Sequence, residues 1–226
     1  MTIQQVIEEQ LSKILREELN IMGCGRTDAG VHASSFYFHA DLPSLDPKLD
    51  LCYKLNRMLG DTILIYEMIQ VNNEAHARFD ATKRSYTYYL STQKQLFRHA
   101  FNYSLNPISI EKLNAVTSLL LGYKEFFPFC KSNTDVNNYI CHLESSKWIQ
   151  TSETCFEFQI SANRFLRGMV RLIVGACLTY MEGRITLEEI EYCLKNQTRL
   201  SRDNSVPADG LFLTQVDYPF IKEKNI

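Results

Sequence analysis

Long apolar runs are missing from this sequence of 226 residues, since none reaches the roughly 18 residues that a membrane-spanning helix requires. A secretory signal peptide is also missing at the N-terminus. Internal repeats and low-complexity segments are absent, which excludes a repeat architecture. We therefore predict a cytoplasmic protein with a packed core and no membrane partner.

Paired cysteines are missing as well. The chain has seven cysteines, an odd number, and none belongs to a C-x-x-C pair. This pattern indicates reduced thiols and argues against a disulfide framework. Cys130, Cys141 and His142 lack the short spacings that zinc ligands use, so we predict no metal site.

An excess of positive charge, the usual mark of a nucleic-acid-binding protein, is the third missing feature, because the formal net charge is −2. The charges are nevertheless unevenly distributed along the chain. Basic residues gather with tyrosines between residues 78 and 89, and three arginines gather between residues 164 and 171. Acidic residues concentrate at 8–18 and 188–191. A local basic surface for RNA is therefore compatible with the acidic total.

Hydrophobic periodicity and capping signals predict both helices and strands. Helices are predicted at residues 3–15 after a Thr2–Gln5 capping box, at 46–59 from Asp46 and Pro47, at 109–121, at 166–181 and at 186–194. Strands are predicted at residues 62–71, 84–91, 142–150, 153–162 and 211–216, and those at 142–150 and 153–162 would form an antiparallel pair. In the strand at 84–91, Tyr86, Tyr88 and Leu90 would share one face and Tyr89 would lie on the other. Trp148 is predicted to lie in the core of the C-terminal half. Their mixed order predicts an α+β fold.

An irregular stretch at residues 93–107 is the predicted boundary between two halves. The N-terminal half, residues 1–95, would carry the loop at residues 25–30. The C-terminal half, residues 96–226, would carry the helix predicted at 166–181.

The most informative segment is residues 25–32, Gly-Arg-Thr-Asp-Ala-Gly-Val-His. Its glycines permit a tight turn that presents Asp28 at the apex. Arg26 would keep that carboxylate ionised even if it were buried. An ionised and oriented carboxylate can act as a nucleophile or a general base. Taken alone, the same residues are also compatible with a turn that carries a surface ion pair.

Three further segments accompany this octet in chain order. Residues 77–88 read Ala-Arg-Phe-Asp-Ala-Thr-Lys-Arg-Ser-Tyr-Thr-Tyr, residues 163–171 read Asn-Arg-Phe-Leu-Arg-Gly-Met-Val-Arg, and residues 208–213 read Ala-Asp-Gly-Leu-Phe-Leu. Together the four segments resemble the motifs of the TruA family of tRNA pseudouridine synthases. The resemblance extends from about residue 3 to residue 219.

The resemblance implies a pseudouridine synthase-like fold, in which two mixed or antiparallel sheet halves carry helices on the outside and an active-site cleft between them. It implies an isomerase that converts uridine to pseudouridine at tRNA positions 38, 39 and 40 of the anticodon arm, acting as a homodimer. The isomerisation involves no redox change, so no cofactor is expected. The family usually opens with a strand and a Tyr-Asp-Gly-Thr turn, which we expect to be absent because the sequence is helical almost from Met1.

The resemblance also assigns roles to individual residues. Asp28 would be the catalytic carboxylate, forming an adduct with ribose or with uracil, or acting as a base on the sugar. Tyr86 would stack on the flipped uracil and assist loss of the C5 proton. Arg171 would pair with Asp28 and orient it. Without the resemblance, Tyr86 reads as a core aromatic and Arg171 as a helix-surface charge. The residues predicted to bind tRNA are Arg26, Arg78, Lys83, Arg84, Arg164 and Arg167.

Two other functions fit parts of the sequence. A truncated synthase without catalytic activity could serve as a tRNA-binding protein, and the missing opening strand favours this alternative. A hydrolase with a carboxylate nucleophile could act on a small substrate. The basic and aromatic segment at residues 78–89 disfavours that hydrolase, because a small substrate needs no such track.

Overall fold

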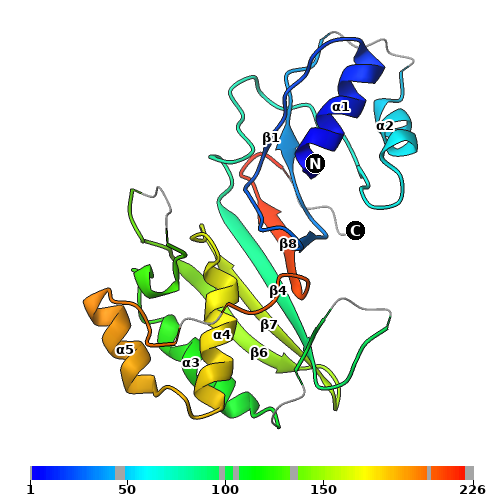
Figure 1. Ribbon diagram of the computed structural model, residues 1–226. Helices are drawn as coiled ribbons and strands as arrows, with labels where there is room; N and C mark the ends of the chain where they lie inside the picture. The colour runs from blue at the N-terminus through cyan, green and yellow to red at the C-terminus, as the bar shows by residue number, and fades with distance from the viewer. Residues whose placement is uncertain are drawn as a thin grey trace. The chain divides into compact units, whose positions relative to one another are not determined.

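The computed structural model describes residues 2–43, 49–96, 100–103, 107–132, 137–202 and 205–221. The helices are α1 (Ile3–Leu15), α2 (Leu51–Leu59), α3 (Ile110–Leu120), the 3-10 helix η1 (Phe127–Phe129), α4 (Met169–Met181) and α5 (Leu187–Asn196) (Figure 1). The strands are β1 (Met22–Gly23), β2 (His32–Ala33), β3 (Phe38–His39), β4 (Lys83–Ser91), β5 (Phe101–Asn102), β6 (Leu143–Gln150), β7 (Cys155–Ala162) and β8 (Leu211–Asp217). None of the described helices is both long and apolar enough to cross a membrane. The mixture of helices and a mixed sheet confirms the predicted α+β class.

Contacts divide the described chain into two compact units. Unit 1 comprises residues 2–26, 37–81 and 219–221, and unit 2 comprises residues 27–36 and 82–218. This division differs from the predicted boundary at residue 95. Strand β4 precedes that boundary but pairs with β7 and β8, which follow it, so β4 belongs to unit 2.

Unit 1 packs α1 against α2 around a small apolar core. The predicted capping box at the start of α1 is confirmed: the Thr2 hydroxyl accepts the Gln5 N–H at 3.2 Å, and the Gln5 side chain accepts the Thr2 N–H at 2.8 Å. Strands β1 and β3 form a short antiparallel ladder beside this helix pair. The buried core residues are Ile7, Leu11, Leu19, Ile21, Leu51, Leu55 and Leu59.

The start of α2 differs from the prediction. Asp46 and Pro47 lie outside the described residues, and Leu49 is not helical. Helix α2 begins at Leu51 because the Asp50 carboxylate accepts the Tyr53 N–H at 2.9 Å. A second aspartate four residues downstream therefore takes the capping role.

The prediction of a strand at residues 62–71 is wrong, since this described segment contains no strand. Both backbone groups of Ile65 are occupied by one side chain instead: its N–H donates to Asn56 Oδ1 at 2.7 Å and its C=O accepts from Asn56 Nδ2 at 2.8 Å. At Ile65, the side-chain amide of Asn56 on α2 therefore takes the backbone hydrogen bonds that a partner strand would otherwise make.

Unit 2 is built on a six-stranded sheet with the order β2-β8-β4-β7-β6, with β5 paired to β4. Strand β4 runs antiparallel to both β7 and β8, with an irregularity at Ser85/Tyr86 against β8. The predicted alternation along β4 is confirmed, because Tyr88 and Leu90 are buried and Tyr86 packs on the same core, whereas Tyr89 lies against Phe212. The predicted antiparallel pair at 142–162 is likewise found as β6 and β7.

Helices α3 and α4 lie against the sheet of unit 2, where α3 contacts both β6 and α4 (Figure 1). Nearly all of α4 is buried, as its continuous apolar sequence requires. It begins at Met169, three residues later than predicted, because Gly168 adopts a left-handed conformation with φ +71°. Trp148 stacks on Phe158 in the same core, which confirms its predicted structural role.

The α3 contact offers a test of this core. Leu113 is fully buried on α3, whereas Leu121 at the end of the same helix is 45% exposed. We expect Leu113→Ala to lower the free energy of unfolding by about 2–5 kcal/mol, and Leu121→Ala by no more than about 0.5 kcal/mol. Urea unfolding followed by the fluorescence of Trp148, the single tryptophan, measures both. Equal effects would contradict the packing of α3.

Candidate active site

The loop that carries Asp28 is held by the sheet of unit 2. Strand β2, which follows the loop directly, pairs in parallel with β8 through His32 and Phe212. Their rings also stack at a centroid distance of 4.7 Å, so His32 packs the loop against the sheet. A turn is found here, but Asp28 opens it and does not lie at its apex: the Val31 N–H donates to the Asp28 C=O at 3.1 Å, and Gly30 has a φ of +84° that favours glycine.

Two cations from distant parts of the chain meet the Asp28 carboxylate. Arg171 Nη1, from the first turn of α4, lies 2.6 Å from Asp28 Oδ2, and Lys131 Nζ lies 3.0 Å from the same oxygen. The side chains of Asp28, Arg171 and Lys131 are 22%, 15% and 32% exposed, so the cluster is largely shielded from water. The predicted Asp28–Arg171 ion pair is confirmed.

Arg171 is fixed on its other side by the backbone. Its Nε donates to the Val206 C=O at 2.8 Å, and the Val206 N–H donates to the Arg171 C=O at 3.4 Å. A cation in the first turn of a helix opposes the helix dipole, and the Asp28 carboxylate offsets this unfavourable interaction. The guanidinium is therefore positioned by Val206 and neutralised by Asp28.

Lys131 is the residue that the sequence analysis missed. Its backbone N–H donates to the Arg167 C=O at 3.0 Å, immediately before Gly168. The Lys131 side chain then crosses Gly168, where an added Cβ would approach Lys131 Cγ, Cδ and Cε at 2.8–2.9 Å. Gly168 thus supplies both a left-handed turn and the space through which Lys131 reaches Asp28. Lys131 and Asp28 are 103 residues apart, so no local sequence pattern signals their contact.

Burial and charge act in opposite directions on the pKa of Asp28. Burial of the carboxyl group raises its pKa, but the Lys131 and Arg171 cations more than offset this effect, so the pKa lies below the ordinary value. Asp28 is therefore ionised at neutral pH. Both cations contact Oδ2, and within the described residues no hydrogen bond reaches Oδ1. The arrangement leaves an ionised oxygen available for reaction.

Tyr86 lies on β4, in the same unit. Its ring is partly buried and meets Phe165 edge-on at a centroid distance of 5.2 Å. Tyr88, two residues further along the same strand face, is fully buried, and its hydroxyl donates to the Pro207 C=O at 3.0 Å. Burial raises the pKa of Tyr88 far above its ordinary value. Tyr86 is thus the more accessible of the two rings, and its role with the uracil base stays a prediction.

Three of the predicted tRNA-binding residues have contacts within unit 2. Lys83 forms an ion pair with Glu144 at 3.0 Å. Arg84 Nη1 donates to the Asn163 C=O at 3.1 Å, and Arg164 donates from its backbone N–H to Asn163 Oδ1 at 2.9 Å. The structure therefore brings Arg84 and Arg164 together at Asn163.

The other three predicted tRNA-binding residues are exposed. Arg167 lies in unit 2 just before Gly168, and Arg26 and Arg78 lie in unit 1. The Arg78 guanidinium carbon lies 5.8 Å from the ring centroid of Phe79. Binding of tRNA by all six residues stays a prediction. Among the described residues no cluster of three or more His, Cys, Asp or Glu side chains is arranged to hold a metal ion.

Comparison with known proteins gives a consistent result over nearly the whole chain. A family model described as tRNA pseudouridine synthase matches residues 116–219. The tRNA pseudouridine synthase A of Parabacteroides distasonis is 42% identical, over 97% of this chain and 87% of the relative. Those of Bacteroides fragilis and Porphyromonas gingivalis are each 38% identical, over 97% and 96% of this chain and 88% of each relative. The identity and coverage of these relatives show that the chain belongs to the tRNA pseudouridine synthase A family.

Proposed function

We propose that this isomerase converts uridine to pseudouridine at positions 38, 39 and 40 in the anticodon arm of tRNA, with Asp28 as its catalytic carboxylate. The observation that carries the proposal is the ion pair between Asp28 and Arg171, two residues 143 positions apart that come from two of the motifs in the sequence. The same geometry does not favour a protein that only binds tRNA, because binding alone requires no shielded, ionised carboxylate.

The reaction breaks the bond between uracil N1 and ribose C1′ and forms a bond between C5 and C1′. The proton on C5 is lost and N1 gains one, so no electron carrier takes part. The target base has to leave its stack before it can react, which costs a few kcal/mol. Tyr86, the more accessible ring on β4, is the proposed stacking partner for the extruded uracil.

Asp28 is suited to three routes. Its free Oδ1 could add to ribose C1′, add to the uracil ring, or remove a proton from the sugar. In each route Arg171 and Lys131 hold Oδ2 and thereby fix the direction of Oδ1. The ionised carboxylate is needed in all three, which is why its lowered pKa supports the proposal.

Six basic residues are proposed to bind the tRNA backbone, since phosphate contacts supply most of the affinity and fix the register. They are Arg26, Arg78, Lys83, Arg84, Arg164 and Arg167. We further propose that the enzyme acts in the cytoplasm as a homodimer.

Tritium release tests the target positions. A tRNA transcript labelled at C5 of every uridine releases one tritium for each pseudouridine formed. We expect release to fall by one equivalent when a single uridine at position 38, 39 or 40 is replaced by cytidine, and to disappear when all are replaced. Undiminished release from the fully replaced transcript would contradict the proposed positions, while still demonstrating isomerase activity.

A further inference from the structure

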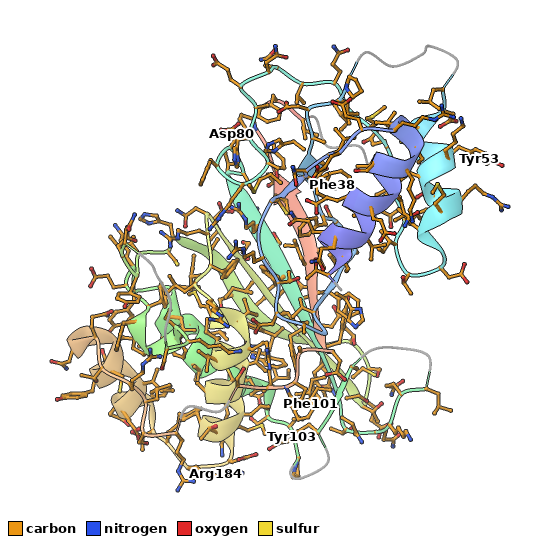
Figure 2. All side chains as sticks on the ribbon, turned by 45° about the horizontal axis from the view of Figure 1, so that its top comes forward. Phe38, Tyr53, Asp80, Phe101, Tyr103 and Arg184 are labelled. Atoms are coloured by element: carbon orange, nitrogen blue, oxygen red, sulfur yellow. The ribbon has the colours of Figure 1, made fainter. Side chains whose placement is uncertain are left out.

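Unit 1 carries an exposed aromatic ring outside the proposed catalytic cluster. Phe79 is 75% exposed, more than any other aromatic side chain that the structure describes. It lies in the turn at residues 76–80 that precedes β4, and Asp80 at the end of this turn is labelled in Figure 2. A single exposed apolar side chain is ordinary by itself, but the backbone of the turn and the stacked His76 ring hold the Phe79 ring in one position.

The turn that carries Phe79 is fixed by hydrogen bonds that do not involve its ring. The His76 imidazole Nδ1 accepts the N–H groups of Arg78 at 3.1 Å and Phe79 at 3.2 Å. The Asp80 carboxylate accepts the His76 N–H at 2.7 Å, and the Asp80 N–H donates to the His76 C=O at 3.1 Å. His39 anchors the turn to unit 1 by accepting the Ala77 N–H at 3.0 Å. The ring is therefore presented by a pre-organised backbone.

The ring also belongs to a short aromatic stack. His76 and Phe79 are stacked with centroids 4.2 Å apart and an interplanar angle of 30°. His39 meets His76 edge-on with ring centroids 4.7 Å apart, so the His76 ring contacts both His39 and Phe79. The Arg78 guanidinium, 5.8 Å from the Phe79 centroid, adds positive charge at the same place.

We propose that Phe79 is a stacking platform for an unpaired nucleobase of the bound tRNA, separate from the uridine that reacts at Asp28. A flat apolar ring beside a cation matches the two parts of a nucleotide, its π-face and its phosphate. Stacking accepts any base, so the platform would bind without reading sequence. The Phe79 ring is held in place before binding, so it loses little conformational entropy when a base stacks on it. Because the ring is already exposed, no side chain has to move to uncover it.

This proposal rests on tRNA as the substrate but not on the positions that are isomerised. The competing occupant of an exposed aromatic ring is a protein surface, such as a second copy of this chain. The neighbouring Arg78 favours a base, because a stacking face with a cation beside it suits a nucleotide, which carries a phosphate next to its base.

A tryptophan at position 79 reports stacking directly. The chain has one native tryptophan, Trp148, which is buried in unit 2 and 2% exposed. We expect the added fluorescence of Phe79→Trp to be quenched by a tRNA transcript and by single-stranded oligouridine, but not by a fully paired RNA duplex. Tyr53→Trp is the matched control, because Tyr53 is 64% exposed on α2 of the same unit and points outward in Figure 2. Equal quenching of both variants, or none at saturating tRNA, would overturn the proposal.

Binding and turnover separate the platform from other roles. We expect Phe79→Ala to weaken tRNA binding by about 5- to 100-fold, mainly as a rise in KM, with kcat for tritium release little changed. Tyr53→Ala should bind like the parent. A lost dimer in light scattering with unchanged tRNA affinity would assign Phe79 to a protein interface and refute the platform. If the reactive positions prove to lie elsewhere in the tRNA, the quenching and binding results retain their meaning.

Discussion

Asp28→Asn is expected to reduce tritium release from C5-labelled tRNA by at least about 10³-fold while leaving tRNA binding intact. Asparagine has nearly the same shape as aspartate but carries no charge. Its amide is a poor nucleophile and a poor base, so each of the three routes proposed for Asp28 fails in the variant. The loss should appear in kcat, because the carboxylate acts on the reacting atoms and contributes little to holding the tRNA.

The variant also leaves Arg171 and Lys131 without their shared anion. Two cations near a neutral amide repel each other, and one of them then turns toward solvent or toward a phosphate. Filter retention of tRNA should therefore be unchanged or slightly stronger. Asp61→Asn, at an exposed turn of unit 1, is the control that changes net charge equally and should keep full activity. Substantial tritium release by Asp28→Asn would remove Asp28 from the mechanism.

Features that depend on near neighbours in the sequence were predictable. The capping box of α1 and the alternation along β4 arise from residues within a few positions of one another, and both are confirmed. The ion pair of Asp28 with Arg171 spans 143 residues, and only the resemblance to a known family connected them. Composition and periodicity alone describe Arg171 as a charge on an otherwise apolar helix.

Features that depend on tertiary contacts were not predictable. Residues 62–71 have the apolar composition of a strand, but Asn56 binds both backbone groups of Ile65. The prediction for the start of α2 relied on Asp46, whereas Asp50, a chemically equivalent cap, precedes the described helix. Lys131 has no motif around it, and its role depends on the space left by Gly168.

Removal of the cations should move the acid limb of the pH–rate profile to higher pH. Burial alone raises the pKa of Asp28, and Lys131 and Arg171 bring it below the ordinary value. Asp28 is active when ionised, so the parent loses activity only at a pH below the ordinary carboxyl range of about 3.9. In Arg171→Met or Lys131→Met the pKa rises, and protonation inactivates the enzyme at a pH where the parent is still active.

Arg171→Met should have the larger effect, lowering kcat/KM at neutral pH by about 100-fold or more, since it removes the shorter contact and the anchor to Val206. Lys131→Met should cost less because Lys131 is more exposed and 3.0 Å from the carboxylate. The variant lacking both cations should have its acid limb at the highest pH, because burial then raises the pKa of Asp28 without any opposing charge. Single-turnover rates from about pH 4 to 8 measure these shifts, with the exposed Lys54→Met as a control for net charge. Urea unfolding identifies a misfolded variant, and in a folded variant a fall in rate without a displaced acid limb would show that the cations do not control the ionisation of Asp28.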